Sequence, residues 1–499
     1  MSLKMKFMKK ALVAFAIIGC QFAIVNSVKA GGLVTNSNQN AAFLRQMSQD
    51  AIIDVTGLYF NPAGTAFLSD GWHVSVNLQN AKQSRDITTD FPLFQQNLEK
   101  PYTPHKFEGD ALAPVIPSLQ LSYNHDRWSV NANFSLGGGG GKCEFDQGLG
   151  SFEAAYAGAL AQNVPAMLPT MLLPGLEAAL IAKGLPAAQA AVLATSLAQT
   201  GHYDGYTLNS YMKGRQYYFG LSLGATYKFM DNLAGFVGLR GVYATCNYNG
   251  FVRPGVGYSV PANAALGFPG TTGKAELPNY GIDLNCDQTG FGVTPILGID
   301  YKINKHWNVA ARYEAETKLR LKNKTEADVP ELVAAAAGPT LGQFADGEKV
   351  AANIPGILSA GAQYSPIDEV RIMAGWHYYF DKAAKQFNNK QDLIDKNTQE
   401  FSAGVEWDIN KWVTVSGSWQ NTRYGLSDMY MSDLSFNLSN NMIGFGVRVN
   451  PTERLHIDLG YMHTFYKDHD VQTLTAAGLK TDTYHRSNRV LGLGVDVDF

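Results

Sequence analysis

The last nine residues of the chain constrain its fold more than any other stretch. From Leu491 to Phe499, apolar residues alternate strictly with glycine and aspartate. A period of two places the apolar residues on one face of a β-strand and the others on the opposite face. A strand of this kind that ends on an aromatic residue is typical of the closing strand of an outer-membrane barrel, with one face in lipid and one in a hydrated lumen. A strand of a soluble sandwich is the alternative that this stretch leaves open.

The same alternation recurs along the chain and predicts about 14 strands. The faces opposite the apolar ones carry Gly, Ser, Thr, Asn and charged residues, which suits a hydrated interior better than a dry core. The predicted strands lie near 72–80, 116–124, 127–137, 215–229, 232–247, 289–303, 306–322, 353–365, 368–381, 398–409, 411–425, 436–450, 453–467 and 486–499.

The connections between these strands alternate between very short and long. The short ones are near His125-Asp126, Met230-Asp231, Asn304-Lys305, Pro366-Ile367, Asn410 and Pro451-Thr452. The long ones span about 81–115, 138–214, 248–288, 323–352, 382–397, 426–435 and 468–485. Short periplasmic turns and long extracellular loops are the pattern of outer-membrane barrels. The sequence therefore predicts an all-β, transmembrane antiparallel β-barrel over 72–499, located in the bacterial outer membrane, in preference to a soluble all-β array.

The longest predicted loop, 138–214, is not featureless. Residues 186–197 and 177–183 have the pattern of helices, with Pro186 at a first turn and Gly201 beyond the end. The loop is rich in apolar residues, and an exposed apolar patch usually marks a ligand or partner site. The alternative is that the loop packs on itself or on its neighbours.

The N-terminus predicts export from the cytoplasm. Lysines precede an apolar run, and a Val-Lys-Ala sequence ending at Ala30 forms a cleavage site, so residues 1–30 are expected to be a signal peptide. The sequence around Cys20 resembles a lipoprotein box, which is the open alternative. After cleavage at Ala30, three cysteines remain. Two of them, Cys246 and Cys286, flank one predicted outer loop and are expected to pair only if their strands are neighbours.

The segment between the signal peptide and the first strand, residues 31–71, does not alternate. It is apolar and punctuated by glycine, so it must be sheltered from water, and the barrel lumen is the obvious place for it. A turn is expected at its Asn-Pro-Ala-Gly stretch, whose small residues allow close backbone approach. That stretch comprises Asn61, Pro62, Ala63 and Gly64. The segment is therefore predicted to be a hatch that plugs the barrel.

Residues 31–70 resemble the N-terminal hatch of the FadL-type outer-membrane transporters. The resemblance is carried by Gly31-Gly32-Leu33, by Asn38-Gln39-Asn40-Ala41-Ala42-Phe43-Leu44-Arg45, by Asp50-Ala51 and by Tyr59-Phe60-Asn61-Pro62-Ala63-Gly64. It extends more loosely to the whole chain through the strand count, the long loops and Phe499. This family takes up long-chain fatty acids and, in some members, aromatic hydrocarbons such as toluene, through a 14-stranded barrel closed by a hatch.

The resemblance implies a passive route for apolar molecules, from the outer loops to a pocket beside the hatch and then sideways through a gap near a kinked third strand. Here the third predicted strand runs into five glycines, which cannot hold a regular ladder firmly. The candidates for the lateral opening are Gly137, Gly138, Gly139, Gly140 and Gly141. The family more often has a Pro-Phe-Gly-like stretch at this place.

A carboxylated ligand in an apolar pocket needs a cationic partner, because an isolated buried charge is very costly. Alternation within the predicted strands points five cations into the lumen, and these are the candidates for binding a ligand carboxylate: Arg240, Arg312, Lys318, Arg320 and Arg371. Inward-facing acids, among them Glu314 and Glu406, allow the other reading. In that reading the charges form an internal ladder that braces the barrel.

The expected function is passive uptake of hydrophobic compounds, foremost long-chain fatty acids. The alternatives are a general porin, a surface adhesin and, less favoured, a lipid hydrolase, since Gly220-Leu221-Ser222-Leu223-Gly224 matches a nucleophile elbow but lies mid-strand. The histidines are scattered without metal-ligand spacing, so no cofactor, metal or enzymatic activity is expected. With 40 basic and 43 acidic residues and no basic tract, nucleic acid is not an expected partner. The expected partners are the apolar ligand, outer-membrane lipids and, through Phe499, the barrel-assembly machinery, with the protein as a monomer.

Overall fold

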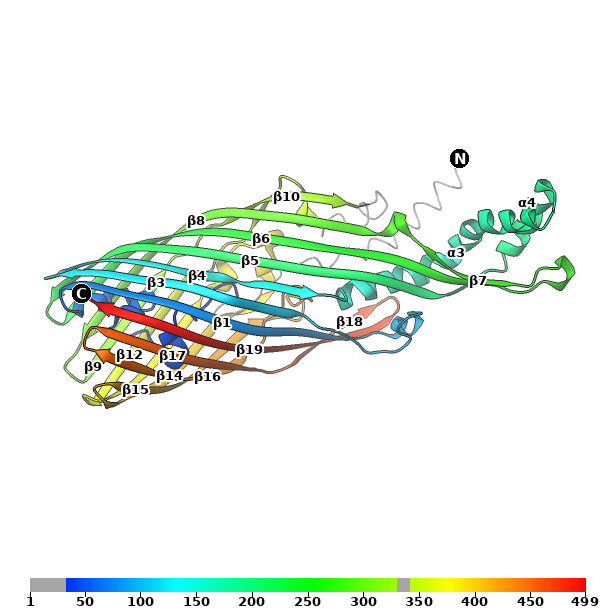
Figure 1. The fold of residues 1–499 in the computed structure, drawn as a ribbon. Coiled ribbons are helices and arrows are strands. Elements are labelled where there is room, and N and C mark those ends of the chain that lie inside the picture. The colour runs from blue at the N-terminus through cyan, green and yellow to red at the C-terminus, as the bar shows by residue number, and fades with distance from the viewer. Residues whose placement is uncertain (1–32, 330–341) are drawn as a thin grey trace.

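The computed structural model describes residues 33–329 and 342–499, which form a closed antiparallel β-barrel (Figure 1). The first and last strands pair continuously from His73–Asp498 to Asp90–Thr481 and close the ring. The described ring has 14 strands, which confirms the predicted fold and strand number, with β10 prolonging β9. The strands are β1 (Gly71–Asp90), β3 (Asp110–His125), β4 (Trp128–Phe145), β5 (His202–Met230), β6 (Leu233–Val260), β8 (Ile282–Lys302), β9 (Trp307–Glu314) with β10 (Arg320–Asp328), β12 (Ile357–Ile367), β13 (Val370–Tyr379), β14 (Ile394–Asn410), β15 (Val413–Leu426), β16 (Asn440–Thr452), β17 (Leu455–Tyr466) and β19 (Gly478–Asp498).

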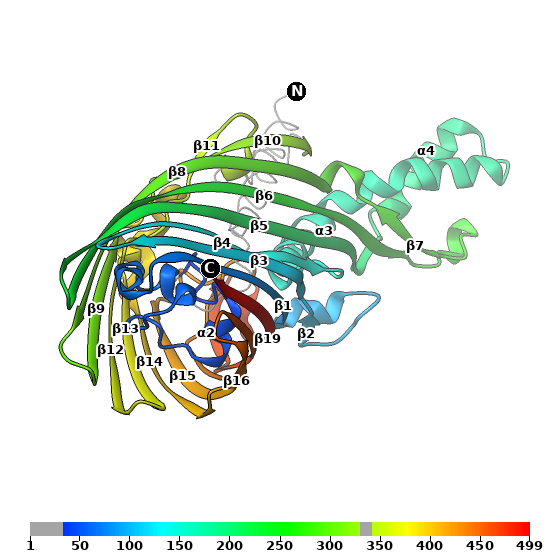
Figure 2. The same cartoon turned by 60° about the vertical axis from the view of Figure 1, so that its left-hand side comes forward.

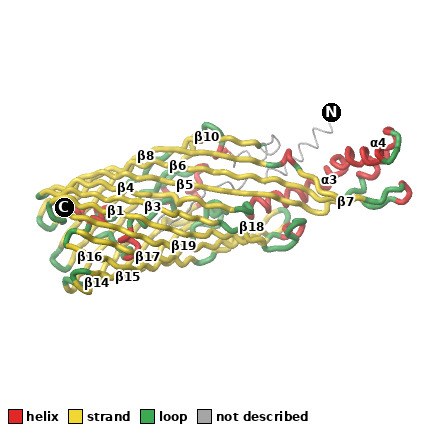
Figure 3. The backbone as a smooth tube through the Cα atoms, in the orientation of Figure 1, coloured by secondary structure: helices red, strands yellow, loops and turns green. Residues whose placement is uncertain are grey.

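Smaller elements lie inside the ring and at its outer end (Figure 3). The accessory strands are β2 (His105–Phe107), β7 (Thr271–Glu276), β11 (Lys349–Ala351) and β18 (His469–Thr475). The α-helices are α2 (Ala41–Arg45), α3 (Gly150–Ala182) and α4 (Ala187–Ala198). The 3-10 helices are η2 (Val55–Tyr59), η3 (Pro62–Phe67), η4 (Pro92–Gln96), η5 (Ala264–Leu266), η6 (Pro278–Tyr280), η7 (Gly342–Phe344), η8 (Asp381–Ala383) and η9 (Phe387–Leu393).

The barrel wall has its apolar side outward. On β1, Val76 and Leu78 are each 50% exposed, whereas the neighbouring Ser75 and Asn77 are buried in the lumen. The same alternation holds on β6, where Val237 is exposed, and on β19, where Leu493 is exposed. An apolar outer belt around a closed ring of hydrogen-bonded strands is the arrangement that hydrocarbon requires. The barrel therefore spans a membrane.

Most of the predicted loops are partly strand, and the two longest, 138–214 and 248–288, show it most clearly. The ends of the predicted loops 138–214 and 248–288 belong to paired β-strands, because β5 and β6, with 29 and 28 residues, are longer than predicted. The outer parts of these strands pack under α3 and bury residues such as Met212 and Val256. These outer parts of β5 and β6 contact other protein segments and not lipid. The alternation that marks a lipid-facing strand is therefore lost there, although the strands remain paired.

The helices differ from expectation in one respect. Helix α4 matches the predicted helix 186–197, but α3 runs for 33 residues where only 177–183 was predicted. Three prolines, Pro165, Pro169 and Pro174, lie inside α3. A proline removes one helical donor and ordinarily ends a helix, so the sequence pattern understates this one.

The three described cysteines, Cys143, Cys246 and Cys286, are free and buried. Cys246 and Cys286 do lie on neighbouring strands, but Cys246 is opposite Gln288 and Cys286 is opposite Tyr248. The two cysteines are therefore diagonal neighbours in the ladder. The Cα atoms of such pairs are about 7–8 Å apart, which is more than a disulfide ordinarily spans. The predicted signal peptide, with Cys20 and Ala30, lies outside the described residues.

The topology predicts which residues face the outside of the cell. A biotin-acceptor peptide inserted at Gly184 or Gly267, both exposed turn glycines with positive φ, should bind streptavidin on intact cells. The same insertion at Asp126 or Thr452, at the opposite end of the barrel, should be labelled only after the outer membrane is permeabilised. Labelling at Asp126 on intact cells would contradict the orientation.

Candidate functional site

The segment from residue 33 to residue 70 lies inside the barrel (Figure 2). Helix α2 is wholly buried and packs against β16, β17 and β19, while η3 packs against β5, β6 and β8 on the opposite wall. The Asn40 side chain caps α2 by accepting a hydrogen bond from the Phe43 amide at 2.8 Å. The predicted hatch is therefore a folded unit that touches both sides of the lumen.

Ion pairs hold one side of the hatch to the wall. Arg45 of α2 bridges Asp458, at 2.6 Å from its Nε, and Glu406. Asp54 accepts from the Arg448 guanidinium at 2.7 Å. The Arg45 pairs are buried, and the Asp54–Arg448 pair is partly buried. Removing one partner of a buried pair leaves an uncompensated charge that costs about 3–5 kcal/mol. The hatch is firmly fixed to this wall.

A histidine bridge adds a third attachment on the same side. The His377 ring contacts Asp50 of the hatch through Nε2 at 2.8 Å and Glu400 of the wall through Nδ1 at 3.0 Å. Tyr379 donates a hydrogen bond to Glu400 at 2.5 Å, and Ser37 donates to the same carboxylate at 3.2 Å. The wall residues of this group, His377, Tyr379 and Glu400, lie on the neighbouring strands β13 and β14, so the hatch is attached across both strands.

The predicted hatch motif forms the contact with the opposite wall. Asn61 caps η3 by accepting from the Gly64 amide at 3.2 Å, and its side-chain amide donates to Asp300 of β8. The Pro62 carbonyl accepts from the Thr226 hydroxyl of β5 at 3.0 Å. A Cβ added at Gly64 would lie 2.5 Å from the Asn61 side chain, so the glycine is required by this close approach.

The wall itself is interrupted at the third strand. The ladder between β3 and β4 stops at the pair Leu119–Phe134 and resumes only at the pair Leu112–Lys142. On the β3 side the interrupted stretch contains Pro114 and Pro117, which carry no N–H to donate. On the β4 side it contains the predicted glycines, and the pairing with β5 shifts register twice among them. The sequence pattern suggested the glycines but not the prolines.

The start of the hatch supplies partners to the interrupted strand. The Asn36 amide donates to the Gly137 carbonyl at 3.1 Å, and the Gly139 amide donates to the Val34 carbonyl at 3.4 Å. The Asn36 side-chain amide donates to the carbonyls of Leu136 and Gly139 at 3.2 and 3.1 Å. In this structure the hatch segment therefore stands in for the missing neighbour strand.

The five glycines differ in what they would tolerate. Gly139 and Gly141 have positive φ values of 73° and 80°, which disfavour any side chain. A Cβ at Gly138 would lie 2.3 Å from the Val34 carbonyl oxygen, whereas a Cβ at Gly137 has nothing within 4 Å. Valine at Gly138 would therefore displace the hatch, and valine at Gly139 would disturb the irregular pairing with β5. Neither substitution would restore a regular ladder. Gly137 is the position where a side chain enters open space.

Two small cavities border the hatch on its η3 side. One lies among Tyr59, Phe236 and Arg240, and the other among Thr35, Gly137 and Arg240. Each offers about 10 Å³, enough for roughly one water molecule. Neither cavity has room for an organic ligand beside the hatch as the structure places it.

Three of the predicted carboxylate-binding cations face the lumen, but each already has an acid. Arg240 makes a bidentate pair with Glu314, both contacts at 2.7 Å, and Arg312 contacts the same carboxylate at 3.1 Å. Arg371 bonds to Asp408 at 2.7 Å and to Glu406 at 3.1 Å. The structure thus places these arginines in the bracing arrangement that the sequence left open as the alternative.

The inward orientation expected for Lys318 and Arg320 is wrong. Both side chains are exposed, on the face opposite the buried Leu319 and Leu321. The reason is the break between β9 and β10, across which the buried positions change from even numbers to odd ones. A period of two carries orientation only within an uninterrupted strand.

The described residues contain a buried arginine pair that the sequence analysis missed. Arg85 of β1 and Arg486 of β19 are directly opposite in the ladder, and their exposed fractions are 0% and 2%. Both reach the Phe436 carbonyl, at 3.3 and 3.4 Å. No described carboxylate pairs with either, and four guanidinium nitrogens, Nε and Nη1 of Arg85 and Nε and Nη2 of Arg486, have no hydrogen-bond partner.

Sequence alternation missed this pair because the first strand was expected to end at residue 80. In the structure β1 continues to Asp90, which places Arg85 in register with the last strand. The signal available in the sequence was an arginine near each of the two chain-terminal strands, and only the barrel closure makes them neighbours.

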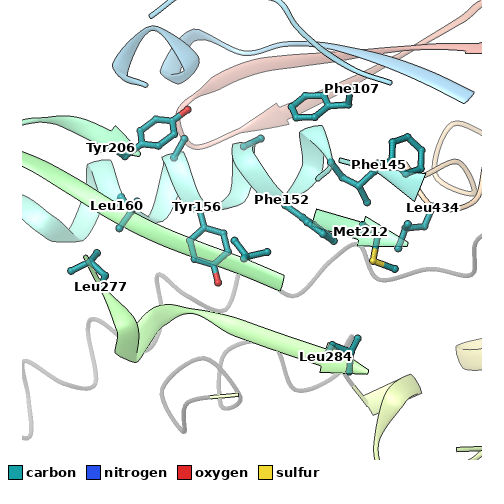
Figure 4. Packing of buried hydrophobic residues seen from close by; sticks show 14 of the residues in the cluster. Phe107, Phe145, Phe152, Tyr156, Leu160, Tyr206, Met212, Leu277, Leu284 and Leu434 are labelled. Carbon is teal, nitrogen blue, oxygen red and sulfur yellow. The ribbon is translucent and has the colours of Figure 1, made fainter. Parts of the chain in front are cut away.

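Aromatic rings surround the arginine pair. The Arg85 guanidinium lies 4.4 Å from the centre of the Phe436 ring, which stacks on Tyr484 at 4.6 Å, and the Arg486 guanidinium lies 5.1 Å from the Tyr466 ring. These rings belong to an apolar cluster that continues outward to the underside of α3. Figure 4 shows part of it, including Phe145, Phe152, Leu160, Met212 and Leu434. Unpaired cations at the inner end of an apolar cluster are the features of a site for an amphipathic anion.

No family model and no curated protein matches the chain. Among solved structures, a FadL homologue from Pseudomonas aeruginosa has 16% identity and a TM-score of 0.58, covering 94% of this chain and 100% of its own. The toluene transporter TodX of P. putida has 12% identity and a TM-score of 0.52, covering 88% and 92%. The chain has the fold of the FadL-type outer-membrane transporters.

The FadL-type fold accounts for the overall architecture and not for the features peculiar to this chain. A TodX deltaS2 mutant, described as a monoaromatic hydrocarbon channel, has a TM-score of 0.54 with 13% identity over 93% of this chain. The hatch and the 14-strand ring are thus features of a shared architecture. The arginine pair, the glycines of β4 and the helices beyond the barrel are properties that must be read from this chain itself.

The contact between hatch and β4 gives a direct prediction. Gly138→Val should expel residues 34–36 from β4, because its side chain would overlap the Val34 carbonyl, whereas Gly137→Val should leave them in place. A Thr35→Cys reporter, buried in the structure, should become reactive toward a small thiol reagent in the first background and stay protected in the second. Equal protection in both backgrounds would show that the hatch segment does not occupy the interruption.

Proposed function

We propose that this protein is a passive outer-membrane channel for apolar molecules that carry an anionic head group, with long-chain fatty acids as the fitting class. The observation that supports this choice is the unpaired, buried Arg85–Arg486 pair within an aromatic cluster. Two adjacent guanidinium groups without an acid destabilise the empty protein, and a carboxylate between them supplies the missing acceptors. A purely neutral hydrocarbon leaves those donors unsatisfied.

The route that we propose follows the apolar surfaces. The ligand enters along the cluster under α3, is held at Arg85 and Arg486 above the hatch, and leaves sideways at the interruption between β3 and β4. The exit is bordered by an apolar cluster that contains Tyr59, Ile116 and Phe219. Keeping the alkyl chain out of water is worth roughly 0.8 kcal/mol per CH₂, so a path from apolar cluster to lipid is favoured over a hydrated pore.

The hatch is divided in a way that supports this route. Its ion-paired side, with Arg45, Asp50 and Asp54, is fixed to the wall from β13 to β17. Its other end, residues 34–36, is held to β4 by a few hydrogen bonds beside small cavities. Hydrogen bonds of this kind contribute about 0.5–1.5 kcal/mol each, so this end is the part that moves at lowest cost.

The arginine pair can be tested by comparing acid and alcohol ligands. In Arg85→Gln/Arg486→Gln, oleate should bind about 10- to 100-fold more weakly, since charged hydrogen bonds contribute about 1.5–3 kcal/mol, while oleyl alcohol should bind unchanged. Binding is measured by isothermal titration of the purified protein in detergent.

The matched control is Arg489→Gln, which removes an exposed arginine from the same strand as Arg486. The double variant should also unfold at the same or a higher temperature than the wild type, because it loses two like charges that lack acids. Equal losses for oleate and oleyl alcohol, or a marked fall in melting temperature, would show that the arginines serve the fold and not a ligand.

The lateral exit gives a separate prediction. Gly137→Val should lower uptake of oleate into cells by severalfold, because its side chain fills open space at the interruption without touching the hatch. Surface amount, heat-modifiable mobility and oleate binding to the purified protein should stay as in the wild type. Normal uptake by this variant would rule out an exit beside Gly137.

A further inference from the structure

The α3–α4 hairpin extends beyond the outer end of the barrel (Figure 1). Its base is fixed: Asp433 accepts from the Ser151 amide at 2.7 Å, and Tyr156 donates to the Tyr280 carbonyl at 2.8 Å. Helix α4 covers one side of the outer half of α3 with Ala190, Ala194 and Leu197. Tyr280 contacts Met167, and Phe268 lies beside Lys183 at the end of α3, while Ile181 and several other residues of the outer half remain exposed.

The composition of this hairpin resembles that of a segment that is buried in the hydrocarbon of a membrane. Between residues 154 and 200 the only charged residues are Glu177 and Lys183. Among the described residues, α3 is the one helix that is long and apolar enough to cross a membrane by length and composition, yet only 28% of its most apolar window is buried. A helix that is apolar on all sides belongs in a protein core or in lipid. The greater part of α3 is not in a core.

Several of the polar side chains of the hairpin are turned back onto their own helices. The Asn163 amide donates to the Ala159 carbonyl at 2.7 Å, and the Thr195 hydroxyl donates to the Ala191 carbonyl at 2.8 Å. These bonds satisfy the side chains internally, which is how polar groups are accommodated where no water is available. A protein partner would instead need polar groups at a rim, about one hydrogen bond for each 100–200 Å².

We propose that the outer end of the hairpin inserts into the hydrocarbon of a phospholipid bilayer outside the cell and takes ligand directly from it. Ile181 and Val192, which are 44% and 70% exposed, are the anchoring side chains. The two charges, Glu177 and Lys183, cancel, so the hairpin has no preference for lipid charge. This inference rests on the proposed function for its purpose, but lipid insertion is measurable by itself.

The apolar path is continuous from this surface to the arginine pair. The buried face of α3, with Leu160, Leu168 and Leu176, belongs to the same cluster as Phe436. A fatty acid that leaves the external bilayer along this face stays on apolar side chains until its carboxylate reaches Arg85. The hairpin thereby removes the step in which the free acid crosses water.

The test uses the full chain in nanodiscs and vesicles of phosphatidylcholine. The wild type should float with the vesicles equally at low and high salt. Ile181→Glu/Val192→Glu should lower the bound fraction by about tenfold or more, because insertion would bury two unpaired charges. The control, Gln199→Glu, adds a charge at an exposed position of the same loop nearer the barrel and should bind as the wild type does.

Uptake in cells separates this proposal from the proposed function. The Ile181→Glu/Val192→Glu variant should lose uptake of oleate presented in vesicles but keep uptake of dissolved oleate. Wild-type protein that ignores vesicles, or a variant that binds them equally well, overturns the proposal. Concentration-dependent dimers that the variant abolishes, without vesicle binding, also overturn it in favour of a second copy as the partner. Vesicle binding without any oleate uptake overturns the transport function and leaves lipid insertion standing.

Discussion

The requirement that every backbone polar group in hydrocarbon has a partner governs this structure. The ladder between β1 and β19 meets it by closing the ring over the full length of both strands. The ladder between β3 and β4 does not, because Pro114 and Pro117 lack donors and the facing glycines depart from regular pairing. Residues 34–36 of the hatch fill that interruption from inside. The hatch is therefore part of the wall as well as a plug in the lumen.

The hatch joins two kinds of interaction with different strengths. Buried ion pairs of Arg45 and Asp50 and a partly buried pair of Asp54 attach it to one wall, where breaking a buried pair leaves an uncompensated charge. Neutral hydrogen bonds attach its first residues to β4, where water or a ligand can replace them at small cost. This difference gives the plug one strongly held side and one weakly held end, and the weakly held end lies at the interruption between β3 and β4.

The buried arginines of the lumen are of two kinds, those paired with acids and those without. Arg240, Arg312 and Arg371 have acids within hydrogen-bond distance and brace the barrel. Arg85 and Arg486 lie deep in an aromatic cluster without such acids. A protein that keeps two unpaired buried cations side by side gives up stability at that place, which is characteristic of a site shaped for an anionic ligand.

The sequence by itself determined the barrel, its 14 strands, the internal hatch and the helix predicted at 186–197, because a period of two, short turns and an apolar segment without alternation are local properties of the chain. It did not determine the length of α3, whose internal prolines argue against a helix, or the orientation of Lys318 and Arg320 after the break between β9 and β10. Only the tertiary structure decided which arginines are paired. Arg85 and Arg486 are about 400 residues apart and meet because the ring closes, whereas Glu314 neutralises Arg240 because two inward faces converge. The alternation in the sequence indicates which face of a strand a residue occupies. The closure of the barrel and the register of its strands decide which residue lies opposite it.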